Sequence, residues 1–255
     1  MQIEKMNFKK MSEMFMFEQK ISIIAGPCTI ESHYQMDKVA ATLVRNNIKF
    51  IRGGAFKPRT SPYSFQGLGI EGLKILSDVC KKHDLISVSE IIDPRDIEIG
   101  LEYINVIQVG SRNMQNYSLL KELGKTNHPV LLKRGMMSTI EEFLLAAEYI
   151  IKEGNKKIIM CERGIRTFET YTRNTLDISC IAVVKQKTKL PIIADLSHSL
   201  GRKDIIKAVF RYMINTDVDG IMLEVHPEPQ YSLSDSKQSL SCDEFTELLE
   251  SNKLY

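Results

Sequence analysis

The feature that most constrains the fold is an alternation, repeated eight times along the chain, between a short apolar run and a segment of helical periodicity. The apolar runs cover residues 21–25, 48–51, 85–88, 106–109, 130–132, 157–161, 191–194 and 220–223. Segments in which apolar side chains recur at helical spacing follow them at 34–46, 69–82, 94–103, 113–123, 139–152, 174–187, 203–213 and 243–251. The pattern predicts eight strand-then-helix units.

Runs that are apolar throughout indicate parallel strands whose outer face is covered by helices. Eight such units in 255 residues match the dimensions of a (β/α)₈ TIM barrel. An open doubly wound sheet is the alternative fold, but no strand-to-helix turn carries a G-x-G-x-x-G or G-x-x-x-x-G-K phosphate loop. We therefore expect an α/β protein with one catalytic barrel over residues 21–255 and a short N-terminal extension over residues 1–20.

Composition and charge exclude several classes of protein. The formal net charge is only +2 and no block of Lys and Arg occurs, which argues against a nucleic-acid partner. No run reaches the roughly 18 apolar residues that a membrane helix needs, so we expect no membrane span. The five cysteines are odd in number and widely spread, with no C-x-x-C pair and no secretory segment ahead of them. We expect reduced thiols in a cytoplasmic protein.

Polar residues follow each of the eight apolar runs. In chain order they are Cys28; Arg52 with Lys57; Glu90; Arg112; Lys133 with Arg134; Glu162 with Arg163; Asp195 with His198; and Glu224 with His226. One charge after a strand usually marks only the start of a solvated loop. Because the active site of such a barrel lies at the carboxyl ends of its strands, eight in succession indicate a site.

The segment 52–67, RGGAFKPRTSPYSFQG, is too rich in Gly and Pro to be helical and contains no acid. Its three cations, Arg52, Lys57 and Arg59, and the hydroxyls of Thr60 and Ser61 are suited to holding phosphate and carboxylate groups. The alternative is a solvated basic loop.

Further cations extend this set around the predicted mouth of the barrel. They are Arg112, Lys133 and Arg163. In a nearly neutral chain such a ring focuses a positive field that attracts substrates with more than one anionic group. Unpaired cations there would repel one another unless anions, or acids such as Glu90 and Glu162, compensate their charge.

A second group combines one thiol, one imidazole and two carboxylates. Its members, Cys28, His198, Glu224 and Asp235, come from the first, seventh and eighth units, which adjoin when a barrel closes. This mixture of ligands suits Mn²⁺, Fe²⁺, Co²⁺ or Zn²⁺ better than Mg²⁺ or Ca²⁺. On the residues alone, His226 competes with His198. We expect this group on one side of the opening and the cations on the other.

Eight segments together carry a resemblance to a known family. They are AGPC (25–28), RGGAFKPRTSPYSFQGLG (52–69), GSRN (110–113), LLKRG (131–135), CERGIRTFE (161–169), DLSHS (195–199), EVHPEP (224–229) and LSDSKQSL (233–240). From about residue 21 to the C-terminus, the chain resembles the 3-deoxy-D-arabino-heptulosonate 7-phosphate (DAHP) synthases of the short microbial barrel subfamily. These metal-dependent transferases condense phosphoenolpyruvate with erythrose 4-phosphate, the first step of the shikimate pathway of aromatic amino acid biosynthesis.

The resemblance implies roles for particular residues. Metal ligands would be Cys28, His198, Glu224 and Asp235, which favours His198 over His226. Phosphoenolpyruvate would be bound by Arg52, Lys57, Arg112, Lys133 and Arg163, and the aldose phosphate by Arg59, Thr60 and Ser61. The expected catalytic set is Lys57, Cys28, His198 and Asp195, in which Lys57 donates to the developing alkoxide and Asp195 orients a ligand or a cation. We expect Mn²⁺ as the ion, with Fe²⁺, Co²⁺ and Zn²⁺ as alternatives, and a homodimer or homotetramer.

Two other functions compete with this interpretation. The related 3-deoxy-D-manno-octulosonate 8-phosphate synthases typically carry an Asn-bearing KANRSS-like segment, and KPRTS at 57–61 favours the four-carbon sugar instead. A non-catalytic barrel that binds a phosphorylated metabolite and regulates a partner enzyme would not need the complete set of ligands and cations.

The sequence departs from the family pattern in the segment around His198. Leu196 stands where many relatives have Pro, and Leu200 stands where a small residue is usual. These departures predict a differently shaped loop around His198. The 20 residues ahead of the barrel are too few for a regulatory or chorismate mutase domain, so we expect no built-in feedback by aromatic amino acids.

Overall fold

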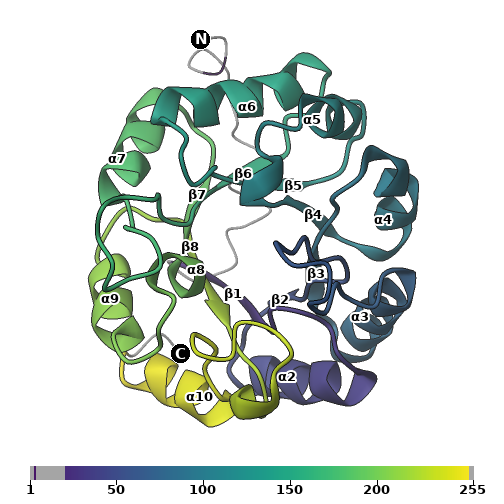
Figure 1. The fold of residues 1–255 in the computed structure, drawn as a ribbon, viewed down its shortest axis with the longest axis vertical. Helices are drawn as coiled ribbons and strands as arrows, with labels where there is room; N and C mark the ends of the chain where they lie inside the picture. Colours follow the sequence, from purple (N-terminus) through teal and green to yellow (C-terminus); the bar gives the residue numbers. More distant parts are fainter. Residues whose placement is uncertain (1–2, 4–20, 253–255) are drawn as a thin grey trace.

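The computed structural model describes Ile3 and residues 21–252. Eight parallel strands form a closed barrel in which each strand pairs with its neighbours in sequence and β8 pairs with β1 (Figure 1). The predicted (β/α)₈ barrel is therefore confirmed. The predicted extension over residues 1–20 lies outside the described residues, apart from Ile3, which is buried and whose backbone N–H donates to Glu148.

The strands are short and the helices surround them. The strands are β1 (Ser22–Gly26), β2 (Phe50–Arg52), β3 (Ile86–Glu90), β4 (Val106–Val109), β5 (Val130–Lys133), β6 (Ile158–Glu162), β7 (Ile192–Asp195) and β8 (Gly220–Glu224). The α-helices are α2 (His33–Arg45), α3 (Ile70–His83), α4 (Ile97–Tyr103), α5 (Tyr117–Gly124), α6 (Ile140–Lys152), α7 (Ile178–Lys187), α8 (Leu196–Leu200), α9 (Ile206–Met213) and α10 (Cys242–Glu250). Three 3₁₀ turns complete the described elements: η2 (Pro94–Asp96), η3 (Ser111–Asn113) and η4 (Pro229–Tyr231).

Helix α6 shows how the local sequence defines an outer helix. The Thr139 side chain accepts from the backbone N–H of Glu142, whose carboxylate accepts in return from the backbone N–H of Thr139. This capping box satisfies two N–H groups that the helix itself cannot pair. The face of α6 that packs on the barrel is apolar and includes Phe143, Leu144, Ala147 and Ile150. Burial of one such large side chain stabilises the fold by about 1.5–3 kcal/mol.

Several boundaries differ from the prediction, and one helix has no predicted counterpart. The helix predicted over 174–187 begins at Ile178, because the Asp177 side chain accepts from the N–H of Cys180 and caps the helix there. The segment predicted to be helical from residue 113 begins as the turn η3 and becomes α5 only at Tyr117. Helix α8 was not predicted, since five residues are too short for a helical period to be read from the sequence.

The inside of the barrel contains two layers of side chains. The first, here called the apolar layer, receives one residue from each strand: Ile24, Phe50, Val88, Val106, Leu131, Ile159, Ile193 and Met222. Because side chains alternate along a strand, the residue two positions further points the same way. In most strands that residue is polar, and the resulting polar layer consists of Cys28, Arg52, Glu90, Gln108, Lys133, Asp195 and Glu224. In the first unit Gly26 has no side chain, and Cys28 takes its place.

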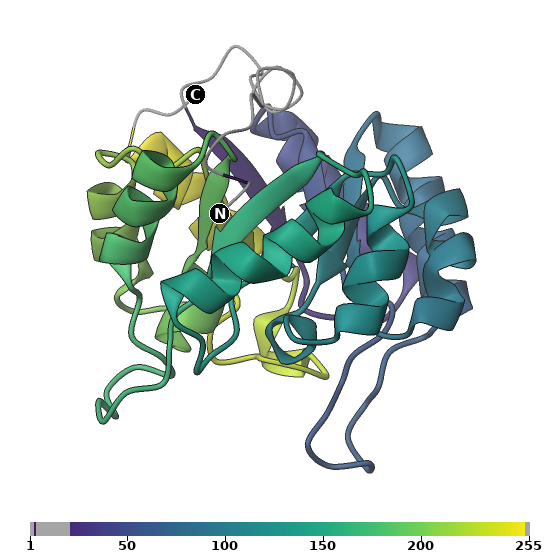
Figure 2. The ribbon, with the colours of Figure 1, turned by 90° about the horizontal axis from the view of Figure 1, so that it is seen from above.

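The loops at the carboxyl ends of the strands are unequal in length. Those from β2 to α3 (blue) and from β6 to α7 (green) project furthest, and both lie on the same side of the barrel (Figure 2). As expected from the sequence, the segment after Arg52 forms no helix until α3 begins. Within the described part of the chain, every helix is too short or too polar to cross a bilayer.

Candidate active site

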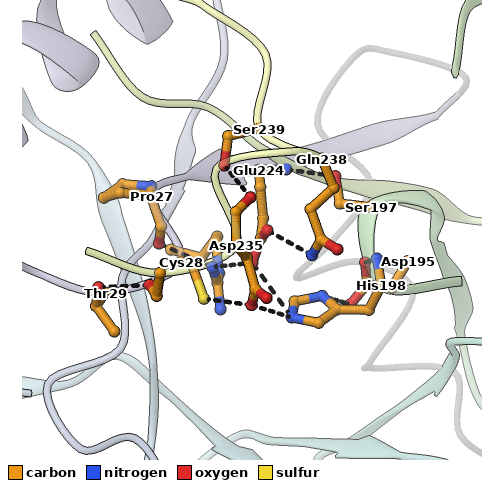
Figure 3. A network of polar contacts seen from close by, with 12 residues as sticks. Pro27, Cys28, Thr29, Asp195, Ser197, His198, Glu224, Asp235, Gln238 and Ser239 are labelled. Atoms are coloured by element: carbon orange, nitrogen blue, oxygen red, sulfur yellow. Dashed lines mark hydrogen bonds and ion pairs between the residues drawn. The ribbon is translucent and has the colours of Figure 1, made fainter. Parts of the chain in front are cut away.

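Four side chains converge at the carboxyl end of the barrel. Each of Cys28, His198, Glu224 and Asp235 offers one donor atom, and these atoms lie within 4.8 Å of one another (Figure 3). Cys28 follows β1, His198 lies on α8, Glu224 ends β8 and Asp235 lies in the loop from β8 to α10. The structure thus brings together the four residues that the sequence grouped as metal ligands.

His226 lies outside this group. Its Nδ1 accepts from the backbone N–H of Glu228, and its Nε2 lies 3.4 Å from a carboxylate oxygen of Glu31. Both ring nitrogens of His226 therefore have partners outside the group. The histidine of the candidate metal site is His198.

The short helix α8 presents His198 to the site. Asp195 caps the helix by accepting from the backbone N–H of His198, and Gly201 ends it in a left-handed conformation. Leu196 and Leu200, where the chain departs from the family pattern, are both buried in the hydrophobic core. The two leucines therefore anchor α8 from behind rather than displacing His198.

His198, Glu224 and Asp235 each present one atom to the group, and a neighbouring side chain lies against the other polar atom of each. His198 Nε2 lies 3.2 Å from Glu224 Oε1, and His198 Nδ1 lies 2.8 Å from Asp195 Oδ2. Asp235 Oδ2 accepts from Cys28 Sγ at 3.0 Å. Asp235 itself has a left-handed backbone, with φ of 52°, which a residue without special support rarely adopts.

The electrostatics of the group are dominated by burial. Burial and the neighbouring Glu224 carboxylate raise the pKa of the Cys28 thiol to about 12. Burial also lowers the pKa of His198, against the attraction of Asp195 and Glu224. Although burial opposes ionisation of Asp235, the charges of Lys57 and His198 hold the pKa of that carboxyl below its usual value. A thiol that must lose its proton, a neutral imidazole and two carboxylates form a donor set that fits a first-row divalent ion.

Three of the predicted anion-binding cations pair with acids of the site, two of them candidate metal ligands and the third Asp195. Arg52 Nη1 lies 3.1 Å from Glu224, Lys57 Nζ lies 3.3 Å from Asp235, and Lys133 Nζ lies 2.5 Å from Asp195. Lys57 Nζ also donates to Cys28 Sγ at 2.7 Å. The metal-ligand group comes from the first, seventh and eighth units and these three cations come from the second and fifth, so the two groups occupy different parts of the ring and meet where these ion pairs form.

Glu162 does not face the cavity. Glu162 is fully buried and pairs with Arg134 at 3.0 Å, while Arg134 also contacts Asp177 at the start of α7. Glu162 and Arg134 are absent from the cavity lining. Glu162 follows Cys161, Arg134 follows Lys133, and both Cys161 and Lys133 point into the barrel. Because side chains alternate along a strand, Glu162 and Arg134 point outward to the helices.

The other three cations remain available for anions. Among the described residues, Arg59, Arg112 and Arg163 form no ion pair; Arg112 donates to the carbonyl of Pro58 and Arg163 to that of Gly164. Burial without a contacting carboxylate lowers the pKa of Arg163. A buried guanidinium without an acid partner is costly, and an anionic ligand would compensate it.

The cavity above the polar layer has a volume of about 320 Å³. Twelve of the residues singled out in the sequence line it: Cys28, Arg52, Lys57, Arg59, Thr60, Ser61, Glu90, Arg112, Lys133, Arg163, His198 and Asp235. Glu224 and Asp195 are fully buried and contact the lining through Arg52 and Lys133. Both the substrate-binding and the metal-binding predictions therefore fall on one opening.

The sequence analysis missed three residues of the site. Gln108 lines the cavity and donates to Glu90, and Arg173 lines the cavity from the loop between β6 and α7. Gln238 is buried beside Glu224. Gln108 stands two positions after Val106, so the strand phase could have identified it. Gln238 lies within the segment LSDSKQSL that carries the family resemblance, whereas no comparable signal marks Arg173.

This fold and this site define a class of protein. The carboxyl end of this (β/α)₈ barrel combines several cations with a thiol, an imidazole and two carboxylates. These features define a barrel enzyme that acts on phosphorylated substrates with a divalent ion.

The particular family follows from comparison with known sequences. The chain belongs to the DAHP synthetase I family, whose model matches residues 13–254. The assignment made from the sequence motifs is thereby confirmed.

Known proteins and structures place the chain within this family. It is 51% identical over 232 residues to phospho-2-dehydro-3-deoxyheptonate aldolase of Thermotoga maritima, a match that covers 91% of this chain and 69% of the relative. A crystal structure of that DAHP synthase has a TM-score of 0.87 at 50% identity and covers 91% of this chain and 68% of its own. A 2-dehydro-3-deoxyphosphooctonate aldolase of Syntrophotalea carbinolica is more distant, at 28% identity over 90% of this chain and 88% of the relative.

Proposed function

We infer that this protein is a DAHP synthase, which condenses phosphoenolpyruvate with erythrose 4-phosphate and water to give DAHP and phosphate, the first step of the shikimate pathway. The observation that carries the inference is a single cavity lined both by three of the four candidate metal ligands and by Arg59, Arg112 and Arg163, which form no ion pair among the described residues. Family membership and 51% identity to a named phospho-2-dehydro-3-deoxyheptonate aldolase support it.

Cys28, His198, Glu224 and Asp235 would hold a divalent transition ion, with Mn²⁺ as the preferred ion and Fe²⁺, Co²⁺ and Zn²⁺ as alternatives. When bound, the ion supplies Lewis acidity that makes the aldehyde carbon of the sugar more electrophilic. The ligand set carries three negative charges once Cys28 is ionised. Lys57, 2.7 Å from Cys28 Sγ, offsets part of this charge and is placed to donate to the alkoxide that develops from the aldehyde oxygen.

The remaining cations would position the two phosphorylated substrates. Arg112, Lys133 and Arg163 would hold phosphoenolpyruvate together with Arg52, and Arg59, Thr60 and Ser61 would hold the phosphate of the aldose. In the reaction, C3 of phosphoenolpyruvate forms a bond to the aldehyde carbon, water adds at C2, and phosphate leaves by cleavage of its C–O bond. Asp195, held between Lys133 and His198, would keep both side chains oriented throughout.

A barrel over residues 21–255 with an extension over 1–20 would form the catalytic unit, working in the cytoplasm as a homodimer or homotetramer. These statements rest on the family and on the lack of any membrane-spanning helix among the described residues.

The competing reaction uses arabinose 5-phosphate, as the relation to the octulosonate aldolases suggests. A test measures loss of phosphoenolpyruvate and release of phosphate with each aldose phosphate, before and after chelation. We expect turnover with erythrose 4-phosphate, abolished by chelation and restored by a divalent transition ion. Preference for the five-carbon sugar would assign the chain to the rival reaction, and binding of phosphoenolpyruvate without phosphate release would indicate a regulatory barrel.

A further inference from the structure

Two residues outside the predicted site lie directly behind the candidate metal ligands. Gln238 lies in the loop from β8 to α10, three positions after Asp235, and Arg173 lies in the loop from β6 to α7. Arg173 Nη1 donates to Gln238 Oε1 at 3.1 Å. The Gln238 side chain is buried, so its amide must find its partners within the protein.

Gln238 holds one oxygen of Glu224. Its Nε2 donates to Glu224 Oε2 at 2.7 Å, while the other carboxylate oxygen, Oε1, lies 3.2 Å from His198 Nε2 (Figure 3). Glu224 therefore presents Oε1 to the donor group, and its Oε2 is engaged from behind.

Arg173 does the same for Asp235. Its Nη1 donates to Asp235 Oδ1 at 3.2 Å, while Oδ2 accepts from Cys28 Sγ at 3.0 Å. One guanidinium nitrogen thus contacts both Gln238 and Asp235. The backbone N–H of Arg173 donates to the carbonyl of Leu200 at the end of α8, which fixes this loop against the helix that carries His198.

The two contacts have a common consequence for coordination. A carboxylate can bind a cation through one oxygen or through both, and a hydrogen bond that engages the outer oxygen favours the first mode. Hydrogen bonds to ligands also fix their orientation, and loss of such partners typically weakens metal affinity by roughly 10- to 100-fold.

We propose that Gln238 and Arg173 are positioning residues of the metal site, a bonded pair that holds the outward oxygens of Glu224 and Asp235 so that each carboxylate offers one oxygen to the ion. The inference rests on the proposed function, because it takes these two carboxylates as metal ligands. It makes the loop from β6 to α7 part of the metal site, although that loop supplies no ligand.

The test is a titration of the full-length, chelator-stripped protein with Co²⁺, followed by visible absorption. The variants are Gln238→Met and Arg173→Met, which keep much of the side-chain length but remove the donors. We expect the Kd for Co²⁺ to rise roughly 10- to 100-fold in each. We also expect weaker absorption per bound ion, because a released second oxygen raises the coordination number and makes the site less tetrahedral.

Matched controls come from the same loop. Gln230→Met and Lys237→Met change an exposed amide and an exposed cation that contact none of the four ligands, and both should leave Kd and spectrum unchanged. Because Gln238 and Arg173 contact each other, the double variant should lose less than the sum of the single effects. If Gln238→Met does not fold, Gln238→Glu keeps the volume while replacing the amide donor with an acceptor, and it should weaken binding as well.

The outcomes separate this inference from the proposed function. If the wild type binds one Co²⁺, Cys28→Ala does not, and the Gln238 and Arg173 variants match the wild type in Kd and spectrum, the positioning role is overturned and the metal site stands. If the wild type binds no Co²⁺, both are overturned.

Discussion

The apolar layer and the polar layer inside the barrel are built on the same strands, in most of them two residues apart, yet they have opposite effects on the stability of the fold. The apolar layer removes eight side chains from water and stabilises the fold at about 25 cal/mol per Å² of buried apolar surface. The polar layer buries charges such as those of Arg52, Lys133 and Glu224, and desolvation of charge opposes folding even when partners are present. In most strands, one alternation step thus separates a residue that stabilises the barrel from a residue of the candidate site.

The largest expected effect tests the polar layer. Cys28→Ala should remove metal binding and reduce turnover more than about 1,000-fold, equivalent to about 4 kcal/mol of transition-state stabilisation. Because the lost group is small, the melting temperature of the metal-free protein should change little. Turnover with excess ion and thermal unfolding of the stripped protein measure the two. Cys242→Ala, remote from the ligand group, is the control, and a fully active Cys28→Ala protein would make Cys28 a packing residue.

The next effect tests the apolar layer. Phe50→Ala should lower the free energy of unfolding by about 3–5 kcal/mol, because it removes a large buried side chain and leaves a cavity. The fraction that remains folded should bind the ion with nearly unchanged Kd. Urea denaturation and metal titration measure both quantities, and Tyr63→Ala, on an exposed loop, provides the control. A large loss of metal affinity in folded Phe50→Ala protein would break the separation of the layers.

A smaller effect tests which substrate each arginine binds in the cavity above the polar layer. Arg59→Ala should raise the KM for erythrose 4-phosphate by roughly 10- to 100-fold, the usual loss for one charge-assisted hydrogen bond. Arg163→Ala should instead raise mainly the KM for phosphoenolpyruvate, because Arg163 directly follows β6 whereas Arg59 lies far along the loop from β2 to α3. Steady-state kinetics with each substrate varied in turn measure the split. Equal effects on both substrates would remove the separate assignments.

The smallest effect concerns charge outside the barrel. Hydrogen bonds from Lys82 and His83 lower the pKa of Asp37 to about 2, and all three side chains are at least partly exposed. Because the folded-state pKa is below the usual 3.8, this stabilisation is present above that pH and is lost as the pH falls toward 2. Asp37→Asn should cost less than about 1 kcal/mol at pH 7 in urea denaturation. The difference from the wild type should shrink below pH 4; a constant difference would exclude the charge as its cause.

The sequence predicted the barrel because eight repeats of one pattern leave few topologies open. It predicted most of the cavity lining because the carboxyl ends of parallel strands meet at one edge. The position of Glu162 just after a strand is not enough to show which way it faces. Because Cys161 points into the barrel, the next residue, Glu162, points outward. Glu90 stands two residues after Val88, which points into the barrel, so Glu90 points inward as well.

Contacts between distant units were beyond the sequence pattern. The pairing of Lys57 with Cys28 joins the ends of two different strands, and the contact of Arg173 with Gln238 joins two loops 65 residues apart. Such contacts depend on the distance between side chains after closure of the barrel. A glutamine in a turn carries no periodicity that would single it out.

The described strand order has one further consequence. Cys28 follows β1, whereas Glu224 and Asp235 belong to the eighth unit, so the ligand group lies across the seam where β1 meets β8. In the sequence, nearly the whole barrel separates Cys28 from Glu224 and Asp235. During synthesis on the ribosome, the ligand group therefore forms only when β8 pairs with β1. An ion bound by these four residues would connect the two sides of the seam and, since it would bind the closed form alone, would stabilise the barrel against separation of β1 from β8.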